Sequence, residues 1–188
     1  RQRGIRHLMT IEDIQPLSAE AFAKAAHFIK TQARPLEQAL YAREFAGAGT
    51  DDIIAALRVY QNDDGGWAAF DRDNTSSYLA KIPFSDFGEA LDPPSVDVAA
   101  HVVEMLGKLG YPRDLPAIRR GYQYIRSQQE ADGSWFGRWG VNYIYGTGAV
   151  LPAMEAIGED MSQPYIRRAV DWLLEHQNAD GGWGESCG

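Results

Sequence analysis

The segment Gln61–Trp67 (QNDDGGW) occurs three times in the chain in slightly altered form. The other two copies are QEADGSW at residues 129–135 and QNADGGW at residues 177–183. Each copy has a Gln, then an Asp-Gly pair three and four residues later, and then a Trp six residues after the Gln. The intervals between the copies have room for about two helices each. This repeat decides the fold, because a fixed pattern that recurs at such intervals is typical of stacked helical units.

The chemistry of each copy predicts a turn between two helices. An amphipathic helix ends near the Gln, and Asp-Gly makes the turn because Gly tolerates a positive φ. The Trp begins the next element, and the Gln amide is placed to bond free N–H groups at the start of a neighbouring helix. Three copies therefore predict a stack of helix pairs, either a toroid or a solenoid.

Amphipathic patterns predict helices before and between the copies. In the segment 149–158, Pro152 is expected in the first turn of the helix, where its missing N–H costs nothing. No alternating strand pattern competes with these helices, so the predicted fold class is all-α. The expected helical segments are residues 18–30, 51–60, 93–110, 120–128, 149–158 and 167–177.

Composition narrows the possible functions. The 188 residues carry a net charge of −8, which argues against a nucleic-acid partner because phosphate binding needs clustered Lys and Arg. The single Cys187 rules out an internal disulfide and a site built from several cysteines, and no metal site is expected. No apolar run approaches the ~20 residues that span a bilayer, and the first residues do not form a signal peptide. We expect one domain or a piece of a larger one. We also expect a location on the cytoplasmic side.

Four stretches of the chain closely resemble the squalene–hopene cyclases. They are QNDDGGWAAFDRDN (61–74), IPFSDFGEALDPPSVDVAAHVVE (82–104), DGSWFGRWGVNYIYGTGAV (132–150) and QNADGGWGESC (177–187). Residues 1–60 do not match them and look more like the helical lead-in of other prenyltransferase-type repeat proteins. The sequence is therefore divided into a lead-in, residues 1–60, and a partial cyclase-like region, residues 61–188.

The resemblance implies an α/α toroid, incomplete here, with helical-hairpin QW repeats around an apolar cavity. It also implies a class II triterpene cyclase, an isomerase that converts squalene to hopene-type pentacyclic products without a cofactor. An Asp-x-Asp-Asp acid protonates a terminal alkene, and the resulting cations meet aromatic faces, which attract them without acting as bases. Squalene or a related isoprenoid lipid is the expected partner. By family analogy the protein contacts the membrane surface as a monotopic protein on the cytoplasmic side.

The resemblance also assigns residues. Phe70, Phe84, Phe87 and Trp139 would line the cavity, although core packing is the commoner fate of an aromatic residue. Asp97 and His101 lie four residues apart, hence on one helix face. The resemblance implies that His101 donates to the acid and that Asp97 supports His101. An ordinary surface pair is the alternative. Tyr145 would hold a water near the acid, or it is simply wedged between helices.

The sequence departs from the cyclases at the acid, because no Asp-x-Asp-Asp occurs. Asp51 and Asp52 are interpreted as residues that begin a helix, and Asp71 and Asp73 follow the first repeat, where the family has no acid. The chain alone is therefore expected to be catalytically silent. The alternatives are a non-catalytic QW-repeat module that binds an isoprenoid lipid or a protein, and a zinc-dependent prenyltransferase toroid, for which Cys187 has no evident partner ligands. An exposed inner-helix face would favour a homo-oligomer or a missing toroid half.

Overall fold

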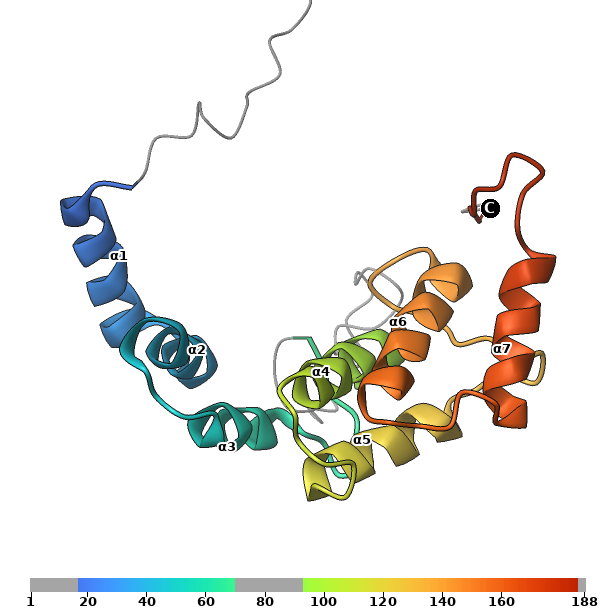
Figure 1. Ribbon diagram of the computed structural model, residues 1–188, viewed down its shortest axis with the longest axis horizontal. Helices are drawn as coiled ribbons and strands as arrows, with labels where there is room; N and C mark the ends of the chain where they lie inside the picture. The colour runs from blue at the N-terminus through green and yellow to red at the C-terminus, as the bar shows by residue number, and fades with distance from the viewer. Residues whose placement is uncertain (1–16, 70–92, 186–188) are drawn as a thin grey trace, which may run out of the picture. The chain divides into compact units, whose positions relative to one another are not determined.

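The structure, a computed structural model, describes residues 17–69 and 93–185. The described residues form seven helices and no strand (Figure 1). The all-α prediction is confirmed. The helices are α1 (Ala19–Gln32), α2 (Pro35–Ala46), α3 (Asp51–Tyr60), α4 (Val96–Lys108), α5 (Pro116–Ser127), α6 (Asn142–Ala156) and α7 (Pro164–Glu175).

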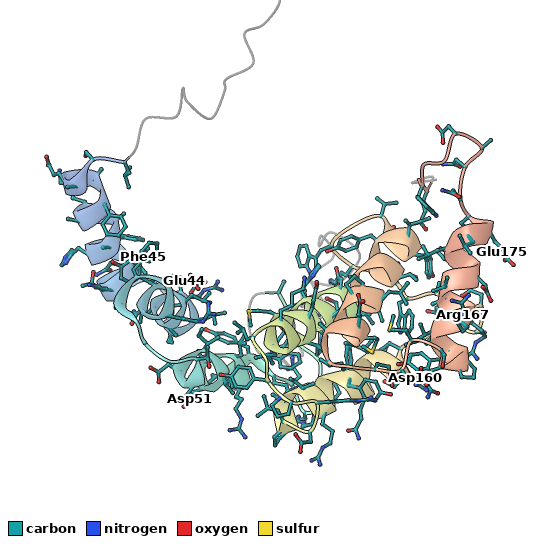
Figure 2. The ribbon with its side chains drawn as sticks, in the orientation of Figure 1. Glu44, Phe45, Asp51, Asp160, Arg167 and Glu175 are labelled. Atoms are coloured by element: carbon teal, nitrogen blue, oxygen red, sulfur yellow. The ribbon has the colours of Figure 1, made fainter. Side chains whose placement is uncertain are left out.

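The chain divides into two compact units, Arg1–Leu57 and Arg58–Gly188. In the first unit, Ser18 caps α1 by accepting a hydrogen bond from the N–H of Ala21 at 3.2 Å. Phe22 of α1 meets Phe45 of α2, which is labelled in Figure 2, edge-on with ring centroids 5.5 Å apart. Each of these two helices buries a single Ala, so the described part of this hairpin has a thin core. The expected boundary between a lead-in of different origin, residues 1–60, and the cyclase-like region, residues 61–188, stays a prediction.

In the second unit, α4 is the central helix. It packs against α5 and α6, and α6 also contacts α7 (Figure 1). Its buried face carries Val96, Ala99, Val103 and Leu106, which recur at helical spacing. Gly107 allows a close approach to α6, because a Cβ there would lie 2.6 Å from the carbonyl oxygen of Ala156. The two hairpins α4–α5 and α6–α7 are thus the predicted stacked pairs.

The three repeat turns, residues 61–67, 129–135 and 177–183, are called the QW turns here. They share one backbone geometry. The Gly after the Asp has φ of 98° at Gly65, 101° at Gly133 and 86° at Gly181, where only glycine is unstrained. The Asp accepts a hydrogen bond from the N–H two residues later at 2.9–3.0 Å in each copy. The Gln, however, donates its amide to backbone carbonyls rather than accepting from free N–H groups as expected.

The prediction for Pro152 was wrong. Helix α6 begins at Asn142, and Pro152 lies inside it rather than in its first turn. The earlier start is stabilised by the carboxylate of Glu185, which accepts hydrogen bonds from the N–H groups of Asn142 (2.6 Å), Tyr143 (3.1 Å) and Ile144 (2.8 Å). These are N–H groups that lack a partner within the helix. The capping residue is distant in the sequence, so the local pattern carries no sign of it.

Candidate functional site

The candidate site centres on Asp97 in the first turn of α4. Its side chain is fully buried, with 0% of its surface exposed. Oδ2 accepts a hydrogen bond from the backbone N–H of Trp139 at 2.8 Å. Oδ1 has no hydrogen-bond partner among the residues that the structure describes. A buried carboxylate oxygen without a donor is costly, so this position is not explained by core packing alone.

Tyr145 faces Asp97 from the first turns of α6. Burial raises the pKa of its hydroxyl above the ordinary value, and the nearby charge of Asp97 raises this pKa further. Two glycines hold the ring in place. A Cβ at Gly137 or at Gly140 would lie 2.5 Å from Tyr145 ring carbons. The glycines of the loop before α6 therefore let the backbone close onto the tyrosine.

His101 lies one turn after Asp97 on α4, yet the two side chains make different contacts. The His101 side chain is 55% exposed, and its Nδ1 is 3.9 Å from a carboxylate oxygen of Glu104. Its ring centroid is 6.4 Å from that of Tyr145. In the described part of the chain no hydrogen bond joins His101 to Asp97, because Asp97 is turned toward the loop that carries Trp139.

An open hollow of about 310 Å³ adjoins the exposed face of α4. It is lined by His101, Glu104, Met105, Lys108 and Leu109. Lys108 and Glu104 form an ion pair along its edge at 2.5 Å. The lining thus combines an imidazole, an ion pair and two apolar side chains.

Of the four aromatic residues predicted to line the cavity, only Trp139 lies among the described residues. Trp139 is 47% exposed, and its backbone is fixed by Asp97. Phe70, Phe84 and Phe87 lie outside the described residues. Trp67 and Trp135 are buried, at 1% and 0% exposure, as expected of repeat residues. Sequence reasoning missed a row of rings, in which Phe136, Tyr143, Trp172 and His176 contact one another in turn with centroids 4.0–6.5 Å apart.

The described residues contain no group of three His, Cys, Asp or Glu side chains that could hold a metal ion. Asp51 and Asp52 form the first turn of α3, as interpreted from the sequence. Asp71 and Asp73 lie outside the described residues. None of the described helices is both long enough and apolar enough to cross a bilayer.

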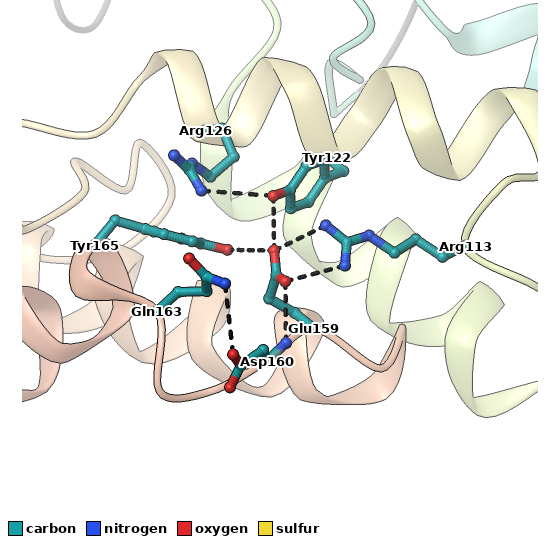
Figure 3. A network of polar contacts seen from close by, with 7 residues as sticks. All are labelled: Arg113, Tyr122, Arg126, Glu159, Asp160, Gln163 and Tyr165. Atoms are coloured by element: carbon teal, nitrogen blue, oxygen red, sulfur yellow. Dashed lines mark hydrogen bonds and ion pairs between the residues drawn. The ribbon is translucent and has the colours of Figure 1, made fainter.

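A second polar cluster lies between the loop before α5 and the loop before α7 (Figure 3). Glu159 accepts hydrogen bonds from both terminal nitrogens of Arg113 at 2.8 and 3.0 Å. The hydroxyls of Tyr122 and Tyr165 donate to the same carboxylate at 2.6 and 2.9 Å. Burial would raise the pKa of Glu159, but these donors lower it to about 2. This cluster could not be predicted from local patterns, because Arg113 and Tyr122 lie far along the chain from Glu159 and Tyr165.

The comparison with known families identifies one match. The model of the squalene-hopene cyclase C-terminal domain matches residues 39–188. The squalene–hopene cyclase of Alicyclobacillus acidocaldarius is 58% identical over 98 residues, which are 52% of this chain and 16% of that enzyme. The dammaradiene synthase of Dryopteris crassirhizoma is 48% identical over 102 residues, 50% of this chain and 15% of that enzyme. The match thus spans about a sixth of the length of these relatives.

Solved structures show the same fold. The apo type II terpene cyclase MstE from Scytonema superposes with a TM-score of 0.57 at 21% identity, over 90% of this chain and 53% of that chain. A variant of MstE in complex with geranylgeranyl dihydroxybenzoate gives a TM-score of 0.56 at 22% identity, over 89% of this chain and 51% of that chain. At this identity the likeness concerns the fold alone, a partial α/α toroid.

Proposed function

The chain belongs to the squalene–hopene cyclase family, and from that premise we propose that it forms part of the cavity wall of a triterpene cyclase. The substrate would be squalene or a related isoprenoid lipid, and the products hopene-type pentacyclic triterpenes. The reaction is an isomerisation, in which an acid protonates an alkene and the cation closes successive rings, so no cofactor is needed. The observation that carries the proposal is the fully buried Asp97 with one oxygen left open.

Asp97 would act as a positioning residue. Its Oδ2 is committed to the N–H of Trp139, which leaves Oδ1 to receive a donor. His101, one turn along α4 with its side chain 55% exposed, would be the donor to Oδ1 from the same helix. The other ring nitrogen could then donate to the acid and sharpen its acidity. The Tyr145 hydroxyl would hold a water beside the acid, since the raised pKa keeps it protonated.

Trp139, with Phe70, Phe84 and Phe87, would supply the aromatic wall. A carboxylate next to a carbocation would trap it or take its proton, whereas an aromatic face attracts it by its quadrupole alone. Each such contact contributes roughly 0.5–2 kcal/mol, more where water is excluded. The 47% exposure of Trp139 supports a role for this residue in ligand contact.

The chain carries no Asp-x-Asp-Asp, so we propose that it protonates no alkene by itself. That absence favours a second candidate function, a non-catalytic QW-repeat module that binds an isoprenoid lipid or a protein. By family analogy, a cyclase piece would lie at a membrane surface on the cytoplasmic side. An incomplete toroid would also favour self-association or a complementary toroid half.

A ligand-binding experiment tests whether Trp139 lines an aromatic cavity that favours cations. The purified chain is titrated with a squalene analogue that carries a tertiary ammonium, and with a neutral analogue of the same length. We expect the cationic analogue to bind more tightly, and Trp139→Leu to weaken it by about 2- to 30-fold while the neutral analogue changes less. Equal affinity for both analogues, unchanged in Trp139→Leu, would contradict an aromatic site for cations.

A turnover assay tests whether the chain alone has cyclase activity. The chain is incubated with squalene in detergent, and cyclised products are sought by gas chromatography and mass spectrometry. We expect none from the chain alone. A hopene-like product would mean that an unrecognised acid is present, and Asp51, Asp52 and Asp73 would be the first residues to replace. Trp183→Phe is a matched control for both assays, because this Trp belongs to a repeat turn rather than to the proposed cavity.

A further inference from the structure

The loop at residues 136–141 carries Trp139 and joins the second QW turn to α6. Its backbone is hydrogen-bonded to two helices. The N–H of Trp139 donates to Oδ2 of Asp97 in α4 at 2.8 Å, and the N–H of Gly137 donates to the carbonyl of Asn142, the first residue of α6, at 2.9 Å. Helices α4 and α6 pack against each other (Figure 1). The loop is therefore held by a packed pair of helices.

A third hydrogen bond joins the residue before this loop to a side chain of α6. The N–H of Trp135 donates to the hydroxyl oxygen of Thr147 at 3.0 Å. Both residues are fully buried, with 0% of their surface exposed. A buried backbone N–H without an acceptor is costly. Thr147 thus supplies the acceptor that allows the chain to leave the QW turn along this path.

The residues before Thr147 bring the loop close enough for this bond. A Cβ at Gly146 would overlap the carbonyl oxygen of Trp135 and lie 2.5 Å from the backbone nitrogen of Gly137. The ring of Tyr145 packs against the same glycine, since a Cβ at Gly137 would lie 2.5 Å from a Tyr145 ring carbon. Three successive residues of α6 therefore form the surface on which the loop rests.

We propose that Thr147 is a positioning residue for Trp139 in the cavity wall. Thr147 acts through its hydrogen bond to the N–H of Trp135, which fixes where the loop begins. Trp139 exposes 47% of its surface, so core packing covers only part of this residue, and the path of the loop backbone sets where its ring lies. The role of Trp139 rests on the proposed function, whereas the anchoring of the loop does not.

The first test reads the position of Trp139 without a ligand. The whole chain carries 5-fluorotryptophan in place of its five Trp and is observed by fluorine NMR, with the signal assigned from Trp139→Phe. Thr147→Val keeps the shape of the side chain and removes the acceptor, whereas Thr147→Ser keeps the acceptor. We expect Thr147→Val to shift or broaden the Trp139 signal and Thr147→Ser to leave it in place. An unchanged Trp139 signal in Thr147→Val would overturn the proposal.

Met154→Ala controls for a general loss of stability. Met154 is fully buried two turns further along α6, so its truncation should destabilise the same helix without removing a bond to the loop. The Trp139 signal should then stay in place. If Met154→Ala moved this signal as Thr147→Val does, the effect would come from stability alone, and the proposal would be wrong.

Amide exchange in the unaltered chain gives an answer even if Thr147→Val fails to fold. The N–H groups of Trp135, Gly137 and Trp139 should exchange as slowly as those inside α6, because all three are bonded to α4 or α6. Exchange as fast as that of an unprotected loop would contradict the anchoring.

The second test measures the consequence for a ligand. The cationic and neutral squalene analogues are titrated into the same variants. Thr147→Val should reduce the preference for the cationic analogue by about 2- to 10-fold, and Thr147→Ser should retain it. In a Trp139→Leu background, Thr147→Val should cause no further loss of preference, because it acts through that ring. A further loss there would mean that Thr147 acts by another route.

The two tests fail in different ways. If the unaltered chain bound both analogues equally, the proposed cation-binding wall would be wrong, and the fluorine signal would still decide whether Thr147 positions Trp139. If the unaltered chain preferred the cationic analogue and Thr147→Val kept that preference in full, the proposed function would stand and Thr147 would not be a positioning residue.

Discussion

At the scale of single residues, Tyr145 depends on two glycines that carry no chemistry themselves. Adding a methyl group at Gly140 would place it 2.5 Å from the Tyr145 ring, so the ring or the loop must move. Gly140→Ala should therefore lower the free energy of unfolding by about 1–3 kcal/mol and change the environment of Tyr145. Urea unfolding measures the first effect. NMR of tyrosine labelled at Cζ, assigned with Tyr145→Phe, measures the second.

Gly148→Ala is the matched control. Gly148 lies inside α6 and has nothing within 4 Å of an added Cβ, and Ala favours a helix over Gly by up to about 1 kcal/mol. We expect this variant to be as stable as the unaltered chain or slightly more so, with Tyr145 unchanged. If Gly140→Ala behaved in the same way, Tyr145 would not be held by the loop.

The lowered pKa of Glu159 predicts that the stability of the protein depends on pH. Its pKa of about 2 lies below the ordinary 4.5, so its contribution to stability is present above pH 4.5 and is lost as the pH falls toward 2. Glu159→Gln should cost about 3 kcal/mol at neutral pH, and the difference from the unaltered chain should shrink between pH 4.5 and 2. Denaturation at several pH values checks this. Asp171→Asn, at an exposed ion pair, should show no such convergence.

The resemblance to the squalene–hopene cyclases selected Asp97, His101 and Tyr145, and the structure brings Asp97 and Tyr145 together. Helical spacing alone could not predict which side of α4 each residue of the pair would meet. Asp97 is buried because the N–H of Trp139, from a distant loop, provides its hydrogen bond. His101 is left half exposed beside Glu104. Their catalytic roles stay predictions.

At the scale of elements, α6 depends on a cap from outside itself. Glu185 accepts from the first three N–H groups of the helix, and its negative charge lies at the positive end of the helix dipole. Glu185→Ala should lower stability by about 1–2 kcal/mol and speed amide exchange at residues 142–144. Hydrogen exchange followed by NMR measures both. Glu175→Ala at the exposed end of α7 (Figure 2) should leave these amides unchanged.

The cap by Glu185 is an example of a feature that could not be predicted from the sequence. Turn chemistry and amphipathic spacing predicted the QW turns and most helices, because those signals are local. The start of α6 was misplaced because the residue that stabilises it follows the third QW turn. The Gln amides likewise donate to carbonyls supplied by neighbouring helices, and their acceptors could not be read from the turn itself.

At the scale of the whole molecule, the repeat predicted an all-α chain of stacked hairpins, and the family match and the described helices agree. The division into two compact units was not visible in the repeat, and the helices of the two units differ in how many residues they bury. Helices α4 and α6 each bury six residues, whereas α1 and α2 bury one Ala each. Large differences in buried side chains imply large differences in local stability.

Native-state hydrogen exchange should therefore separate the units. Amides of α1 and α2 should open locally and exchange on the order of 100-fold faster than those of α4 and α6, whose exchange should require global unfolding. Urea at concentrations well below the unfolding midpoint should leave this order unchanged. If instead all four helices exchanged at one rate, they would open together as one cooperative body. Residues 17–46 would then not open as a separate hairpin, although each of its two helices buries a single Ala.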